Sequence, residues 1–210
     1  MATTQIDLRS YVFLDSLQPQ HAAFLGTVAG GFLPLPGQAC LYVEISPGIE
    51  INRITDIAVK STRVFPGMQI VERLYGLLEV HSDSQADVRQ AGQAILDACG
   101  LVEGDRRKPR VLSSQVIRLV DPLQAQLINR MRHGNMLVPG HSLYVMELEP
   151  AAYAALAANE AEKAAHITLV DVKPFGNFGR LTMMGSEAEA EEAQRAAVRA
   201  METINRTAKG

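Results

Sequence analysis

The stretch Leu35-Pro36-Gly37, followed by the apolar run Cys40-Leu-Tyr-Val-Glu-Ile45, occurs twice in this chain. Its second copy is Val138-Pro139-Gly140 followed by Leu143-Tyr-Val-Met-Glu-Leu148, which matches the first in length and character. Short apolar runs bounded by proline and glycine are typical of buried strands. The sequence therefore predicts one structural unit written twice, and the search for repeats comes before any other interpretation.

Further matches extend the repeat on both sides of these runs. Upstream, Asp15-Ser-Leu17-Gln18-Pro-Gln20 recurs as Asp121-Pro-Leu123-Gln124-Ala-Gln126, each time after a β-type apolar run. Downstream, both runs end at a proline, Pro47 and Pro150, and a helical pattern follows each. In the first copy Ser46 is placed to cap that helix, with Pro47 in its first turn.

The predicted helix after each proline is followed by two strands. From Ile51 to Ala58 apolar residues recur at i, i+3 and i+7, whereas the second copy of this helix is the alanine-rich segment 151–165. Tyr75-Gly76 and Phe175-Gly176 are predicted to form the turns between the paired strands. The four strand-like runs are Met68–Val71, Leu77–Val80, Thr168–Val170 and Arg180–Met183.

Each copy ends in a helix marked by a capping pattern, Ser84-x-x-Asp87 or Ser186-x-x-Glu189. The order per copy is strand, short helix, strand, helix, two strands, helix. We therefore predict an α/β (α+β) fold of two tandem domains, each a small, mostly antiparallel sheet flanked by helices. Charges and breakers in 100–109 predict a solvated linker. The boundaries are 1–100 for the first domain, 101–110 for the linker and 111–210 for the second domain.

Composition and clustering exclude several classes of function. A net charge of −3 gives no general attraction for nucleic acid or anionic lipid, and no stretch reaches the ~18 apolar residues that span a bilayer. Cys40 and Cys99 are too few for a disulfide framework. The histidines lack zinc-ligand spacing and are interpreted as surface or packing residues. They are His21, His81, His133, His141 and His166. We predict no catalytic residue, no metal and no cofactor.

Charged residues differ between the copies at one position of interest. Glu72-Arg73 follows the apolar pair Ile70-Val71, where the second copy has Val172-Lys173. An exposed ion pair at the end of a strand, worth about 0 to 1 kcal/mol, is one interpretation, and a functional role is the other. The ends of the middle helices, Asp56 to Lys60 and Asn159 to Lys163, are interpreted as i,i+4 helix support.

Together these residues resemble the bacterial microcompartment shell proteins, specifically the circularly permuted tandem-domain trimers of carboxysome and metabolosome shells. The resemblance covers nearly the whole chain. It rests on Leu17-Gln-Pro-Gln20, Phe32-Leu-Pro-Leu-Pro-Gly-Gln38, Val43-Glu-Ile-Ser-Pro-Gly48, Asn52-Arg-Ile-Thr-Asp56, Val71-Glu-Arg-Leu-Tyr-Gly-Leu-Leu-Glu79 and Ala157-Ala-Asn-Glu-Ala-Glu-Lys-Ala164.

The resemblance implies a non-enzymatic shell protein in the cytoplasm, in which three chains supply six domains to a pseudohexagonal disc. Discs of this kind pack edge to edge with other shell hexamers and pentamers, and members of the subclass also stack two trimers face to face. Lys60 and Lys163, with Asp56 and Asn159, would lie at the disc edges. Glu72-Arg73 would line a large threefold pore, where arginines alternating with glutamates close it and displaced side chains open it for metabolites.

Two other classes of function stay open. A regulatory protein that binds a small metabolite between its two copies needs a concave polar pocket. An enzyme with a site in the interdomain cleft needs perturbed titratable groups gathered there, and it ranks last because no such cluster is visible.

Overall fold

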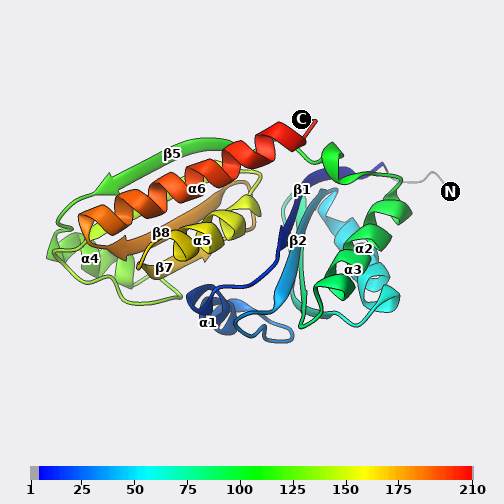
Figure 1. Cartoon of the computed structure of the whole chain (residues 1–210), viewed down its shortest axis with the longest axis horizontal. Helices are drawn as coiled ribbons and strands as arrows, with labels where there is room; N and C mark the ends of the chain where they lie inside the picture. The colour runs from blue at the N-terminus through cyan, green and yellow to red at the C-terminus, as the bar shows by residue number, and fades with distance from the viewer. Residues whose placement is uncertain (1–4, 210) are drawn as a thin grey trace.

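A computed structural model describes residues 5–209 and contains the predicted repeat (Figure 1). Its element order agrees with the predicted order in both copies. The elements of the first copy are β1 (Asp7–Leu14), α1 (Pro19–Val28), β2 (Ala39–Ser46), α2 (Ile51–Ser61), β3 (Phe65–Glu72), β4 (Tyr75–Ser82) and α3 (Gln85–Cys99). Those of the second are β5 (Arg110–Ile117), α4 (Pro122–Asn129), β6 (Ser142–Glu149), α5 (Tyr153–Ala164), β7 (Thr168–Lys173), β8 (Gly179–Gly185) and α6 (Glu187–Thr207).

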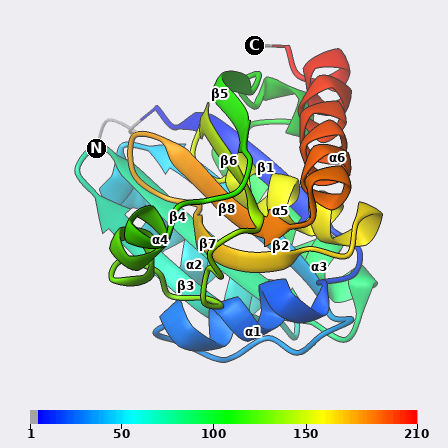
Figure 2. The ribbon, with the colours of Figure 1, turned by 90° about the vertical axis from the view of Figure 1, so that its left-hand side faces the viewer.

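Each copy forms a four-stranded antiparallel sheet, with strand orders β1-β2-β4-β3 and β5-β6-β8-β7. Helices α2 and α3 cover one face of the first sheet, and α5 and α6 cover one face of the second (Figure 1). Viewed along the long axis, the second sheet lies in front of the first (Figure 2). The predicted fold class is confirmed.

Strand β2 is buried on both faces, which explains why its sequence is a nearly continuous apolar run. Leu41, Val43 and Ile45 join a core with the residues of α2 and α3. Cys40 and Tyr42 point to the opposite face and belong to a second core, which also contains residues of α1, β6 and α5. The second domain therefore covers the outer face of the first sheet.

Backbone hydrogen bonds correct the alignment of the two copies upstream of the strands. Leu17 N donates to Gln38 O at 2.8 Å and Gly37 N donates to Leu17 O at 2.9 Å. Val120 makes the same pair of bonds, with His141 O and Gly140 N, both at 2.9 Å. Leu17 is thus equivalent to Val120, so the predicted match of residues 15–20 with 121–126 is wrong by three positions.

The same correction applies to the turns between the last two strands. Tyr75-Gly76 begins β4 instead of forming the turn, which consists of Arg73 and Leu74. Arg73 has a φ of 54°, and a positive φ is what the favoured two-residue hairpin turns require at their first central residue. Gly76 pairs with Ile45 as Gly179 pairs with Leu148, so the residues equivalent to Glu72-Arg73 are Phe175-Gly176, not Val172-Lys173.

The helix caps agree with the sequence in two of three cases. Ser84 and Ser186 accept hydrogen bonds from the backbone N of Asp87 and Glu189. Ser46 does not cap α2, because it ends β2 and the chain stays extended at Pro47 before a 3-10 turn over Gly48–Glu50.

The segment between the copies is more ordered than a solvated linker. It contains a 3-10 turn over Glu103–Asp105. Arg106 is buried and donates to Thr207 Oγ1 of α6 at 2.6 Å. The expectation of a solvated segment is therefore wrong at Arg106, because the end of α6 returns to cover it.

Candidate functional site

The β3–β4 turn and the end of β7 meet on the surface, although they come from different copies. Lys173 Nζ lies 3.9 Å from Glu72 Oε1, and both side chains are a little over one-third exposed. Lys173 Nζ also lies 5.2 Å from the centre of the Phe175 ring. Solvent screens an ion pair of this length, so it contributes only about 0 to 1 kcal/mol.

Arg73 stands at the tip of the same turn. Its side chain is exposed, as is that of Leu74. At the equivalent turn of the second copy Gly176 replaces the arginine, with a φ of 94°. The charged pair Glu72-Arg73 is therefore carried by one copy only.

The predicted edge residues differ in what they contact within the chain. Lys60 Nζ lies 2.7 Å from Asp56 Oδ1, and both side chains are more than half exposed. This contact confirms the predicted i,i+4 helix support. Lys163 is less exposed and lies 3.0 Å from both Asp15 Oδ1 and Glu160 Oε1.

Asn159 does not lie at an exposed edge, contrary to the prediction. Its side chain is fully buried. Its Oδ1 accepts from Gln18 N at 3.0 Å, and its Nδ2 donates to Ser16 O at 3.2 Å. Asn159 instead holds the start of α1 against α5, because α1 of the first copy packs against the middle helix of the second copy.

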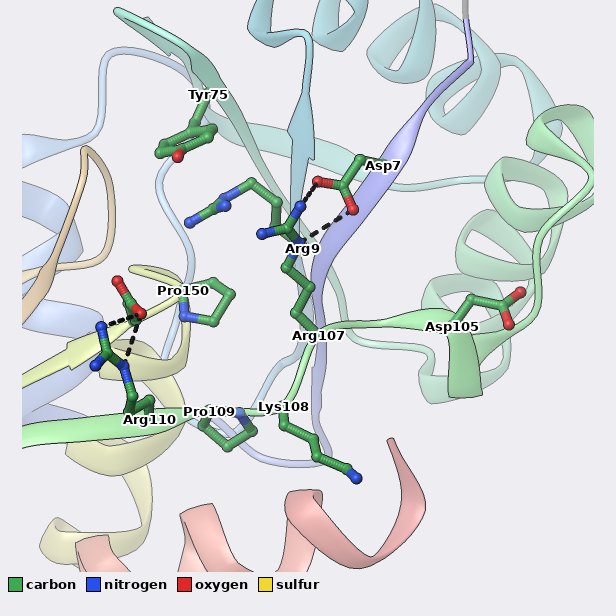
Figure 3. Close-up of a pocket in the computed structure, with 10 residues that line it drawn as sticks. Asp7, Arg9, Tyr75, Asp105, Arg107, Lys108, Pro109, Arg110 and Pro150 are labelled. Carbon is green, nitrogen blue, oxygen red and sulfur yellow. Dashed lines mark hydrogen bonds and ion pairs between the residues drawn. The ribbon is translucent and has the colours of Figure 1, made fainter. Parts of the chain in front are cut away.

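A hollow of about 670 Å³ lies where the two domains meet, beside the β3–β4 hairpin. Figure 3 shows Arg9, Tyr75, Arg107 and Arg110 around it. Two of the arginines pair with carboxylates of the lining: Arg107 Nη2 lies 2.6 Å from Asp7 Oδ2, and Arg110 Nη2 lies 2.7 Å from Glu149 Oε1. Arg9 stacks on the Tyr75 ring, 3.5 Å from its centre. These acidic partners compensate the charges of Arg107 and Arg110, whereas Lys108, which also lines the hollow, has no ion pair among the described residues.

Two buried carboxylates escaped the sequence interpretation. Glu44 accepts from Arg9 Nε at 2.8 Å and from Ala152 N at 2.9 Å, and desolvation raises its pKa against the opposing effect of Arg9. Glu79 accepts from Gly67 N at 3.1 Å and lies 3.2 Å from His81 Nδ1. Burial likewise raises the pKa of Glu79. Each carboxylate interrupts an apolar strand run, and this sequence feature could have indicated that both are buried.

Other candidate chemistry is sparse in the described part of the chain. Residues 5–209 contain no group of three or more His, Cys, Asp or Glu that could hold a metal ion. No helix among them is both long and apolar enough to cross a membrane. His21 and His81 are buried and the other three histidines are exposed, as predicted. Desolvation lowers the pKa of His21 to about 4, so its imidazole is neutral at pH 7.

Known proteins are similar to this chain in sequence over nearly its whole length. The CsoS1D N-terminal domain family matches residues 8–105. The chain is 59% identical over 200 residues to the carboxysome shell protein CcmP of Synechococcus elongatus, covering 95% of this chain and 94% of the relative. It is 50% identical over 202 residues to the carboxysome shell protein CsoS1D of Prochlorococcus marinus, covering 96% of this chain and 79% of the relative.

Two solved structures share the complete tandem fold. The fused permuted hexameric shell protein of the RMM microcompartment superimposes with a TM-score of 0.92 at 41% identity, covering 95% of this chain and 98% of the other. A double-ringed trimeric shell protein from the same kind of compartment gives a TM-score of 0.89 at 39% identity, covering 94% and 96%. The chain therefore belongs to the tandem-domain shell proteins of bacterial microcompartments, in the family of the carboxysome shell proteins CsoS1D and CcmP.

Proposed function

We propose that three copies of this chain form a pseudohexagonal, non-enzymatic tile of a microcompartment shell, with a large central pore that Glu72 and Arg73 gate. The observation that carries the gate is the meeting of both domains' hairpins at Glu72 and Lys173, beside the exposed turn of Arg73. On a threefold axis these charges would occur as three identical sets. Metabolites too large for a narrow pore would then cross the shell here.

The proposed gate works by exchange of partners at Glu72. In one state Glu72 pairs with Lys173 of its own chain, which leaves the arginines to repel one another and move apart. In the other, Glu72 pairs with Arg73 of a neighbouring chain and the ring of charges occludes the axis. A weak, half-exposed ion pair suits such a switch, because the two states then differ by only a few kcal/mol.

The proposed tile contacts other shell hexamers and pentamers through its edges, where the exposed Lys60 would meet a neighbouring tile. Lys163 would form a second, weaker type of edge, because two carboxylates in its own chain already pair with it. A stacked pair of trimers, as the name of the double-ringed relative describes, is a further assembly included in the proposal.

Light scattering and a structure of the assembled chain test this proposal. We expect a trimer or two stacked trimers, with Glu72 and Arg73 on the threefold axis. Glu72→Ala should shift the pore between closed and open states, and Glu192→Ala on the exposed face of α6 serves as the control. A chain that stays monomeric at high concentration, or Glu72 far from any symmetry axis, would contradict the proposal.

The alternative, a regulatory protein that binds a metabolite between its domains, finds weaker support. The interdomain hollow has the necessary size, but its arginines are paired with carboxylates. Calorimetric titration with small anionic metabolites distinguishes the two: stoichiometric binding in the hollow of a monomer would favour the alternative.

A further inference from the structure

A second hollow between the two domains, of about 400 Å³, lies along β1. Strand β1 contributes Tyr11 and Phe13 to its lining, and α3 contributes Arg89. Leu156 of α5 and Ile204 of α6 line it from the second domain, and β1 runs between these two helices and α3 (Figure 1). A concave volume of this order with walls from two domains is typical of sites for small ligands.

Arg89 stacks on an aromatic ring at the edge of this hollow. Its Cζ atom lies 3.8 Å from the centre of the Phe13 ring. Such a stack leaves the N–H groups at the edge of the guanidinium free to donate. The Arg89 side chain is exposed, and no carboxylate among residues 5–209 forms an ion pair with it. The hollow therefore has one cation whose charge the described residues leave unpaired.

Tyr11 supplies a second donor. Its side chain is only 7% exposed, and its hydroxyl lies against the backbone of α3 at Gly92, where a Cβ atom would collide with it. Burial raises the pKa of Tyr11 to about 12, so the hydroxyl stays protonated at pH 7. No described residue accepts a hydrogen bond from this hydroxyl, so the donor is available to a ligand in the hollow.

The other charged groups beside Tyr11 compensate each other. Glu103 lines the hollow, and its Oε1 accepts from Arg106 Nη1 at 2.5 Å. Arg106 is only 3% exposed, and its Nε atom has no hydrogen-bond partner among the described residues. Because Glu103 and Arg106 cancel, Arg89 gives the hollow a surplus of one positive charge.

The second copy fills the equivalent place with its own side chains. By strand register and helix caps, Ser114 and Gln194 are equivalent to Tyr11 and Gly92. Gln194 Nε2 donates to Ser114 Oγ at 3.1 Å and to Ser114 O at 3.0 Å. The hydroxyl that is open in the first copy is therefore bonded in the second.

The charge is also paired in the second copy. Glu191 is equivalent to Arg89 by the same alignment, and it accepts from Arg118 Nη2 at 2.8 Å. An ion pair and a hydrogen bond thus take the place of the two open donors of the first copy. Because the same fold supports both arrangements, the open donors of Arg89 and Tyr11 are not a requirement of folding.

We propose that the hollow along β1 binds a small monocarboxylate, whose carboxylate accepts hydrogen bonds from Arg89 and Tyr11. The free edge of an arginine matches the two oxygens of a carboxylate. Leu156 and Ile204 are partly buried on the opposite wall, where a short apolar chain would gain affinity by leaving water. A phosphate group carries up to two negative charges at pH 7 and exceeds the single positive surplus of the hollow. The site lies within one chain and does not depend on the proposed tile.

Calorimetric titration of the intact chain with hexanoate tests the site. We expect saturable binding that weakens about tenfold or more in Arg89→Gln, the scale of one lost charge-assisted bond. Hexanamide, which has the same shape without the charge, and inorganic phosphate should both bind more weakly than hexanoate. Equal binding of hexanoate and hexanamide would overturn the proposal, and so would the absence of saturable binding.

Two further variants distinguish the proposed contacts from a general charge effect. Tyr11→Phe removes only the hydroxyl and should weaken hexanoate binding while circular dichroism stays unchanged. Arg195→Gln, at an exposed arginine of the equivalent helix α6, is the matched control and should bind as the wild type does. Hexanoate should also raise the Tm of the wild type and leave that of Arg89→Gln unchanged, because it binds the folded chain. Binding that survives both Arg89→Gln and Tyr11→Phe would overturn the site, whereas light scattering reports the trimer separately.

Discussion

The equivalent helices α1 and α4 satisfy their N-terminal amides in different ways. The side chain of Gln18, the N-cap residue of α1, accepts no capping bond from the helix amides, and Glu162 of the other domain accepts from Gln20 N at 2.7 Å and from His21 N at 3.0 Å. Helix α4 is capped by its own Asp121, which accepts from Leu123 N at 2.7 Å. The partner of α1 belongs to the same chain, whereas the described residues 5–209 leave Leu123, Leu127 and Met131 of α4 exposed.

This difference shows how equivalent helices of a duplicated domain can serve different contacts, one within the chain and one with a second chain. Covalent linkage keeps the partner of α1 at a high effective concentration, so buried polar groups can be shared between the two domains. A surface that waits for a second chain must have its backbone donors satisfied beforehand, because a donor left unpaired after assembly costs about 1 to 3 kcal/mol. The self-capped, apolar α4 meets that requirement.

The largest loss in the free energy of unfolding is expected at Glu44, a buried charge that contacts both domains. Glu44→Ala leaves Arg9 buried without its partner and removes the acceptor for Ala152 N at the start of α5. Breaking a buried pair from one side costs about 3 to 5 kcal/mol. Denaturant unfolding at fixed protein concentration should show this loss, and Glu192→Ala on the surface of α6 should change little. Equal effects of the two variants would contradict the shared-charge interpretation.

The two helix caps should also differ in cost. Glu162→Ala leaves two amide donors of α1 unpaired in the domain contact, and we expect a loss of about 1 to 3 kcal/mol. Asp121→Ala removes an ordinary cap from exposed α4 and should cost about 1 kcal/mol. Thermal unfolding of both variants makes the comparison. If Asp121→Ala were the more destabilising, the claim that the domain contact replaces the cap of α1 would fail.

The sequence predicts the element order and most caps because these depend on local patterns. The short apolar strand runs and the Ser84 and Ser186 caps are each specified within about four residues. The alignment of the copies is different. The Leu-Gln motifs at Leu17 and Leu123 are similar in sequence. The backbone hydrogen bonds to the following loop nevertheless show that Leu17 is structurally equivalent to Val120. A short match cannot detect such a shift when the helix that follows is weakly patterned.

The candidate site was only partly predictable for a related reason. Glu72-Arg73 stands out as a local charge difference, but its contact with Lys173 depends on how the two domains meet. The burial of Asn159 and Glu44 follows from the same packing, which brings together residues more than 100 positions apart. Local sequence patterns do not show which residues from the two copies come into contact.

Replacing the buried Glu79 is expected to raise the free energy of unfolding, by less than the preceding variants lower it. The second copy carries Thr182 at the equivalent position. Burial raises the pKa of Glu79 above its unfolded value, so its favourable contribution is present below about pH 4.5 and is lost as pH rises through the raised pKa. Glu79→Gln keeps an acceptor for Gly67 N without the charge. We expect this variant to gain stability relative to the wild type as pH rises above about 4.5, measured by denaturant unfolding, with the difference vanishing well below that pH. A constant difference across this range would contradict the assignment.

The smallest effect on stability is expected at the hairpin contact between the two copies. Lys173→Met should change the free energy of unfolding by less than about 1 kcal/mol, because its ion pair with Glu72 is long and partly exposed. Lys60→Met, which removes another exposed ion pair, is the matched control. The two variants should differ only in the assembled tile: without Lys173, Glu72 has no ion-pair partner among residues 5–209 of its own chain and should turn toward Arg73 of a neighbour. A crystal structure of the Lys173→Met trimer with Glu72 unmoved would show that the weak contact between the two hairpins is a surface ion pair with no role in gating.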